Sequence, residues 1–272
     1  MSRILTGIVG VSLGLAAVLL VEGVWFFVLC ALVIVMATWE FRRIARFWAP
    51  RAPLAMLLVT VPALGYGLAF LPSFAEDRLA TGVLFAAVVL SVGLATVVLL
   101  ARTPVRDSLP AVGALAFGTL YFGVPLASLV RLQHIDPWLL VLALAIVWAG
   151  DVAALYAGRA FGRRRLAPVV SPNKTWAGAV AGFIAGLAVV AAWSAWHLGA
   201  VSWPLMAVGA ATACAAQLGD LVESMFKRGA GVKDSGQILP GHGGMFDRLD
   251  ALLFGAPVML LGVLLIGLPA LS

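Results

Sequence analysis

The stretch QLGDLVESMFKRGAGVKDSGQILPGHGGMFDRLD, from Gln217 to Asp250, concentrates charge in an otherwise apolar chain. Five of the chain's twelve acidic residues fall within these 34 positions: Asp220, Glu223, Asp234, Asp247 and Asp250. Basic residues and glycines lie among them: Lys227, Arg228, Lys233, Arg248, Gly229, Gly231, Gly236, Gly241, Gly243 and Gly244. Hard divalent cations prefer carboxylate oxygens, whereas phosphates bind to Lys, Arg and exposed backbone amides, which glycine makes accessible. The stretch therefore indicates a site that holds a metal and a polyphosphate together.

The spacing of the acids strengthens this interpretation. Asp220 and Glu223 are three residues apart near the end of a predicted helix, and Lys227 follows Glu223 by four, so the three side chains share one face. Asp247 and Asp250 repeat the spacing where the next helix is predicted to begin. Two helix ends, each with a carboxylate pair, suggest a metal held between them. The alternative is a loop whose charges are solvated or paired, but the glycines and the apolar flanks favour the metal site.

The composition of the whole chain is that of a membrane protein. Hydrophobic residues make up 63% of the 272 positions and charged residues 11%, with a mean hydropathy of +1.08, which excludes an ordinary soluble globule. We predict an all-α, polytopic membrane protein with about nine spans, of which the first two could form a tilted hairpin. The spans are 4–21, 23–39, 54–71, 79–101, 109–130, 138–158, 175–196, 203–225 and 249–268. Residues 1–135 would form an N-terminal set of helices and 136–272 a catalytic set with cytoplasmic loops.

Basic residues predict the orientation of these spans. The net charge of +6 could indicate nucleic-acid binding, but the basic residues are dispersed between apolar segments, so no nucleic-acid partner is expected. One set of alternate connections receives sixteen Lys and Arg residues, and the other receives only Arg78 and Arg131. Because cytoplasmic loops carry the basic excess, we predict a multi-pass protein of the inner membrane with a cytoplasmic N-terminus. The stretch from Gln217 to Asp250 would then face the cytoplasm.

A second polar run, WAGDVAALYAGRAFGRRRLAPVVSPNKTWAG, begins at Trp148. Asp151 lies inside a predicted span, where an ionisable side chain costs about 3 kcal/mol, so it is either paired with a basic residue or part of a polar cavity. Ser171 or Asn173 could cap the following helix. The start of that helix, with Lys174 beside it, would also suit a phosphate.

These motifs resemble the phosphatidate cytidylyltransferase family, also called CDP-diacylglycerol synthases. S-M-F-K-R from Ser224, K-D-S-G from Lys233 and P-G-H-G-G-M-F-D-R-L-D from Pro240 carry the resemblance over about 27 consecutive positions. The D-x-x-A-Y-x-x-G-R-x-F-G block and the S-P-N-K-T-W run extend it through the C-terminal half. One departure is Ala177, which stands where the family often has an acidic or amide side chain.

The resemblance implies that the chain transfers CMP from CTP to phosphatidic acid in the lipid bilayer. The products would be CDP-diacylglycerol and pyrophosphate, in a Mg²⁺-dependent step of phospholipid biosynthesis. Asp220 and Asp247 are the expected Mg²⁺ ligands, with Glu223 and Asp250 as further ligands or ligands of a second cation. Lys227 and Lys233 are the expected catalytic cations. The expected substrate-binding residues are Ser171, Asn173, Lys174, Ser224, Arg228, Asp234, His242, Gly243, Gly244, Arg248 and Asp250.

Two other functions remain open at this point. A CTP-dependent polyprenol or lipid kinase needs a similar metal and phosphate site. An ion-coupled transporter could use Asp151, Asp220 and Asp247 as an ion pathway, although its acids should be dispersed near the midplane of the membrane. A homodimer is a further possibility that the sequence leaves open.

Overall fold

The computed structural model describes residues 2–50, 52–70, 107–236, 238 and 243–268. Helices form most of it, as predicted, and one short hairpin joins two of them. The elements are α1 (Ser2–Leu20), α2 (Gly23–Ala45), the 3-10 helix η1 (Leu54–Met56), α3 (Leu57–Phe70), α5 (Ser108–Ile135), α6 (Pro137–Phe161), β1 (Arg165–Ala167), β2 (Ser171–Thr175), α7 (Trp176–Leu198), α8 (Trp203–Gly229) and α9 (Phe246–Ile266).

Six of the described helices are long and apolar enough to cross a bilayer: α2, α5, α6, α7, α8 and α9. Each corresponds to a span predicted from hydropathy, which confirms the class of an all-α, polytopic membrane protein. The segment Leu54–Phe70 is a shorter apolar helix. The predicted span 79–101 lies outside the described residues, so the total of nine stays a prediction.

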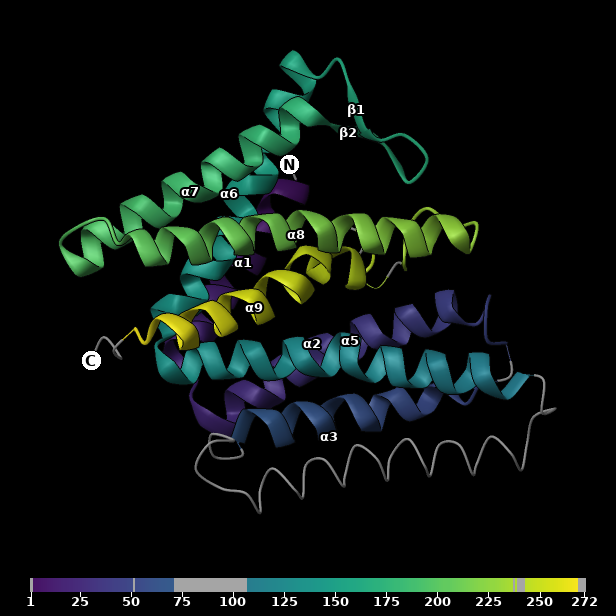
Figure 1. Cartoon of the computed structure of the whole chain (residues 1–272). Helices are drawn as coiled ribbons and strands as arrows, with labels where there is room; N and C mark the ends of the chain where they lie inside the picture. The colour runs from purple at the N-terminus through teal and green to yellow at the C-terminus, as the bar shows by residue number, and fades with distance from the viewer. Residues whose placement is uncertain (1, 51, 71–106, 237, 239–242, 269–272) are drawn as a thin grey trace.

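The helices pack as pairs that run alongside one another. The most extensive contacts join α6 with α7, α8 with α9, and α3 with α5, while α5 also packs against α2 and α9 (Figure 1). An aromatic cluster fills the junction of α2, α5, α8 and α9. The ring of Phe41 lies 6.1 Å from Phe226, 6.0 Å from Phe246 and 5.3 Å from Phe122. Such edge-to-face pairs hold the four helices together directly beside the charged residues Glu40, Lys227 and Asp247.

The hairpin between α6 and α7 was not predicted. β1 and β2 pair antiparallel, with Arg165 opposite Thr175, and Figure 1 shows the hairpin extending away from the ends of α6 and α7. The prediction that Ser171 or Asn173 caps α7 is wrong, because both residues lie in β2. Thr175 is the cap, and its hydroxyl accepts a hydrogen bond from the Gly178 amide at 3.1 Å.

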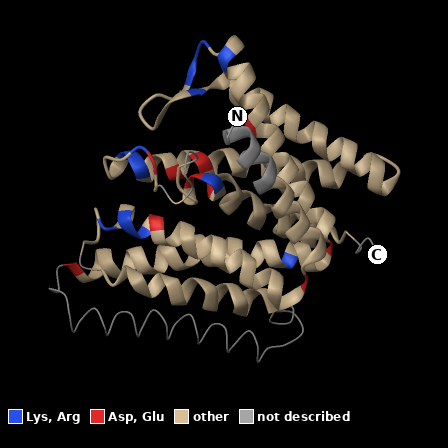
Figure 2. Cartoon of the chain, turned by 180° about the vertical axis from the view of Figure 1, so that it is seen from behind, with Lys and Arg blue, Asp and Glu red and all other residues tan. Residues whose placement is uncertain are grey.

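Charged side chains are distributed unevenly along the helices. Figure 2 shows most of the Lys and Arg positions, coloured blue, at one end of the helices, where the hairpin, the end of α8 and the start of α9 lie. This asymmetry agrees with the basic excess counted from the sequence. Which side of the membrane this end faces stays a prediction.

Candidate active site

The two helix ends predicted to form a site do meet. Carboxylate oxygens of Asp220 and Glu223 on α8 and of Asp250 on α9 all lie within 4.8 Å of one another, and we call these three residues the acidic cluster. Gly219 makes this closeness possible, since a Cβ at that position would collide with the backbone oxygen of Asp250. The crossing of α8 and α9 at a glycine therefore places the three carboxylates together.

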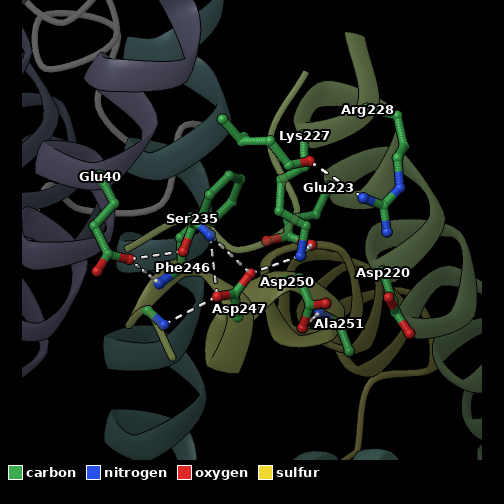
Figure 3. Close-up of polar contacts among 12 residues, drawn as sticks. Glu40, Asp220, Glu223, Lys227, Arg228, Ser235, Phe246, Asp247, Asp250 and Ala251 are labelled. Atoms are coloured by element: carbon green, nitrogen blue, oxygen red, sulfur yellow. Dashed lines mark hydrogen bonds and ion pairs between the residues drawn. The ribbon is translucent and has the colours of Figure 1, made fainter. Parts of the chain in front are cut away.

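Asp247 occupies a different position from the acidic cluster. One of its oxygens lies 2.6 Å from Nζ of Lys227, and the amides of Ser235 and Gly244 donate to the carboxylate at 3.2 and 2.9 Å (Figure 3). Lys227 Nζ also lies 2.6 Å from Oε2 of Glu223. Lys227 thus joins Asp247 to the acidic cluster. Its contact with Glu223 was predicted from their spacing of four residues on one helix, whereas its contact with Asp247 was not.

A second lysine reaches the acidic cluster from the hairpin. Lys174 on β2 places Nζ 2.5 Å from Oδ2 of Asp220. Residues 46 positions apart in the sequence are therefore in contact, and the expectation that Lys174 approaches the site is met by this geometry. Lys174 from the hairpin and Lys227 from α8 thus each pair with a carboxylate of the acidic cluster.

The acidic cluster has the chemistry of a divalent-cation site. Glu223 is fully buried, and its Oε1 has no hydrogen-bond partner in the described part of the chain. Three carboxylates this close repel one another, and a buried charge is costly unless a cation or hydrogen bonds compensate it. Oxygen ligands of this kind suit Mg²⁺. The residues Asp220, Glu223 and Asp250 therefore fit the cation implied by the sequence, whereas the ligand role expected for Asp247 stays a prediction.

A cavity of about 740 Å³ opens beside the acidic cluster, between α6, α7, α8 and the hairpin. Polar and charged side chains line one part of it: Asp151, Arg159, Arg165, Asn173, Lys174, Gln217 and Asp220. Apolar side chains such as Ile146, Val147 and Leu155 line another part. Asp151 faces this cavity, which favours the second of the two interpretations given from the sequence.

The other predicted site residues spread around this centre. Lys233 and Asp234 are exposed and line a separate cavity of about 360 Å³ with Arg43. Arg228 is exposed and donates to the Val232 carbonyl at 3.3 Å. The remaining residues are Gly243 at the start of the segment 243–250, Arg248 in the first turn of α9, Ser224 on α8 and Ser171 on β2. His242 lies outside the described residues. Because Lys233 lines this separate cavity, its catalytic role stays a prediction.

Sequence reasoning missed Glu40 and Ser235. Glu40 lies on α2, 1% exposed, and its Oε2 accepts hydrogen bonds from Ser235 Oγ and the Phe246 amide, both at 2.9 Å (Figure 3). The signal that could have found Glu40 is an acidic side chain at the end of an apolar span, which is usually paired or functional. Arg159 and Arg165 in the cavity were also missed as site residues.

Comparison with known proteins identifies the family to which the chain belongs. Phosphatidate cytidylyltransferases from Haemophilus influenzae and Brucella suis are 42% and 41% identical over 153 and 156 residues, which cover 52% and 54% of this chain. These matches span about half of the relatives' length, 53% and 55%. A phosphatidate cytidylyltransferase from Pseudomonas aeruginosa is 36% identical over 264 residues, 94% of each chain. A model described as the cytidylyltransferase family matches residues 1–266. With a match of that extent, the chain belongs to the cytidylyltransferase family.

Proposed function

We propose that this protein is a phosphatidate cytidylyltransferase. A phosphate oxygen of phosphatidic acid attacks the α-phosphorus of CTP and forms a new P–O bond. The bond from the α-phosphorus to the oxygen that bridges to the β-phosphate breaks, and pyrophosphate leaves with that electron pair. CDP-diacylglycerol is the lipid product. The similarity to phosphatidate cytidylyltransferases, one of them over nearly the full chain, supports the proposal.

The observation that carries the proposal is the cavity next to the acidic cluster. Its charged lining includes Arg159 near the end of α6, and its apolar lining includes Ile146, thirteen residues earlier on the same helix. At 1.5 Å per residue, these positions are roughly 20 Å apart along the helix. A site that runs from charged side chains at a helix end into the apolar interior suits a substrate with a phosphate headgroup and acyl chains. The chains can stay in the bilayer while the phosphate reaches Lys174 and Asp220.

The chain's own residues would act by positioning and by charge. A phosphate monoester is already a nucleophile, so the reaction needs alignment and neutralisation of negative charge more than it needs a strong base. Lys174 and Arg165 are placed to bind phosphate oxygens in the cavity. Lys227 is fixed between Glu223 and Asp247, where its ammonium group balances the acidic cluster.

Asp220, Glu223 and Asp250 would hold a Mg²⁺ ion, which would neutralise triphosphate oxygens when it is bound. The sequence places Asp247 in the same role. Its contacts with Lys227 and two backbone amides instead favour a role in holding Lys227 and the start of α9. A second cation and a homodimer stay predictions.

The acids support an enzyme more than a transporter. The acidic cluster and Asp247 gather toward the C-terminal end of α8 and the start of α9, rather than being dispersed over several spans at the midplane. We place the site on the cytoplasmic side of the inner membrane, because the basic excess lies at the same end of the helices (Figure 2).

Label transfer tests the proposal. Purified protein is incubated with phosphatidic acid in mixed micelles, Mg²⁺ and CTP labelled at either the α- or the γ-phosphate. Entry of the α-label into lipid, with the γ-label released in pyrophosphate, is the expected result. Transfer of the γ-label to a lipid acceptor would support the kinase instead, and transfer of neither label would contradict the proposal. Asp220→Asn serves as the inactive control.

A further inference from the structure

Glu40 connects the N-terminal helices to the loop between α8 and α9. It lies near the end of α2, is 1% exposed, and contacts residues 195 and 206 positions later in the chain. Its Oε2 accepts the hydroxyl of Ser235 and the amide of Phe246, both at 2.9 Å. A carboxylate is costly to bury among apolar helices, so packing alone does not account for its place there.

The loop backbone folds closely around this carboxylate. A Cβ at Gly236 would collide with Oε1 of Glu40, and a Cβ at Gly244 would collide with Oε2. Both sides of the described loop therefore approach Glu40, one just after Ser235 and the other just before Phe246. Because Gly236 and Gly244 have no side chains, the loop can pack against the Glu40 carboxylate, and the hydrogen bonds of Glu40 hold the loop in place.

The same loop residues hold Asp247. The Ser235 amide donates to Asp247 Oδ2 at 3.2 Å while its hydroxyl donates to Glu40, and Phe246 directly precedes Asp247. Gly244, whose Cα packs on Glu40, donates its amide to Asp247 at 2.9 Å. Asp247 in turn holds Lys227 at 2.6 Å. Both loop amides that donate to Asp247 thus belong to residues that lie directly against Glu40.

We propose that Glu40 is a positioning residue for cytidylyl transfer: it fixes Ser235, Gly244 and the start of α9, and through them the orientation of Asp247 and Lys227. This inference rests on the proposed function. Glu40 does not line the 740 Å³ cavity or belong to the acidic cluster, so it acts through other residues rather than on substrate. It also assigns a task to the N-terminal half of the chain, because α2 supplies the buried acceptor that orders the C-terminal site.

Four variants test the inference. Glu40→Ala removes the acceptor, and Glu40→Gln keeps a carbonyl oxygen that can accept both hydrogen bonds. Ser235→Ala removes one donor without touching α2. Glu22→Ala is the matched control, since Glu22 lies exposed at the opposite end of α2 and makes no side-chain hydrogen bond to that helix start.

Kinetics and hydrogen exchange are measured on all four. Loss of residues that orient ligands and charged groups typically costs about 10- to 100-fold in activity. Glu40→Ala is therefore expected to lower kcat by about 10- to 100-fold while the KM for phosphatidic acid changes by less than about 3-fold. Ser235→Ala should fall between Glu40→Ala and wild type. Glu40→Gln and Glu22→Ala should stay within about 5-fold of wild type. Amide exchange in the peptide that covers residues 243–250 should become faster in Glu40→Ala and stay unchanged in Glu40→Gln.

A double variant separates positioning from general packing. If Glu40 acts through Ser235, the Glu40→Ala/Ser235→Ala protein should lose no more activity than Glu40→Ala alone, because contacts in one network are not additive. Three results would each overturn the inference. They are activity losses that multiply in the double variant, amide exchange that is unchanged in Glu40→Ala, and a loss of activity in Glu40→Gln as large as that in Glu40→Ala. Exchange needs no substrate, so absence of cytidylyl transfer in the wild type would refute the proposed function without affecting this readout. If Glu40→Ala fails to fold, Ser235→Ala decides, and wild-type kcat with wild-type exchange in that variant would refute the inference.

Discussion

Replacing Lys227 by Gln should destabilise the protein strongly. The side chain of Lys227 is 12% exposed, and its ammonium lies 2.6 Å from Glu223, which is 1% exposed, and 2.6 Å from Asp247, which is 13% exposed. Removing one partner of a buried ion pair leaves an uncompensated buried charge and costs about 3–5 kcal/mol, whereas an exposed pair contributes about 0–1 kcal/mol. Because all three groups are largely shielded from water, we expect Lys227→Gln to lose about 3–5 kcal/mol of unfolding free energy.

The measurement is equilibrium unfolding in detergent micelles, followed by tryptophan fluorescence. Arg228→Gln is the control, since Arg228 is the next residue on α8, is exposed and donates to the backbone carbonyl of Val232. It should lose less than about 1 kcal/mol. Adding Glu223→Gln to Lys227→Gln should recover part of the loss, because it removes one of the carboxylates left unpaired. A loss of unfolding free energy below about 1 kcal/mol in Lys227→Gln, or no recovery in the double variant, would show that Lys227 does not compensate the buried charges of Glu223 and Asp247.

Four further predictions concern the site. Asp220→Asn should abolish Mg²⁺-dependent turnover while the protein stays inserted and folded, as judged by gel filtration in detergent; near-normal turnover would remove Asp220 from the metal site. Asp247→Asn should also abolish turnover in the same assay, through loss of the contact with Lys227, and an active variant would show that this contact is dispensable. Lys174→Gln should change stability by less than about 1 kcal/mol, since the pair with Asp220 is partly exposed, but should raise the KM for a phosphate-bearing substrate; an unchanged KM would exclude Lys174 from binding. Gly219→Leu should force α8 and α9 apart, cost about 1–3 kcal/mol and weaken divalent-ion binding, measured by Mn²⁺ titration, whereas unaltered binding would contradict the close crossing.

Much of the fold followed from hydropathy, because a bilayer sets both the length and the composition of a spanning helix. The six spanning helices that the structure describes all correspond to predicted spans. The pairing of Glu223 with Lys227 also followed from the sequence, since residues four apart on one helix are neighbours. Hydropathy and the spacing of residues along one helix are local properties, so they can be predicted from a single sequence.

Contacts between distant segments were harder to predict. Asp247 and Asp250 have the same spacing as Asp220 and Glu223, but the crossing of α8 and α9 decides which of these acids lie close together. Asp250 joins the acidic cluster, whereas Asp247 turns toward Lys227 and the loop amides. The α6–α7 hairpin was missed because three- and five-residue strands show no clear alternation, and capping by Thr175 depends on the extended backbone of that hairpin.

The contacts of Glu40 were the hardest to predict from the sequence. Its partners lie about 200 residues away, and the sequence indicated the glycines around it only as part of a Gly-rich loop that could bind phosphate. The structure gives Gly236 and Gly244 a further task, which is to admit a carboxylate from α2. Burial of the acid, rather than any motif, identifies it.

In the proposed function, α8 and α9 bring Asp220, Glu223 and Asp250 together to hold the divalent cation on which cytidylyl transfer would depend. An anomalous-scattering map of crystals grown with Mn²⁺ and CTP tests it most directly. We expect a peak about 2.0–2.3 Å from oxygens of at least two of these three carboxylates, next to the triphosphate. A peak bound by other residues, or a nucleotide bound with no cation at these carboxylates, would contradict it.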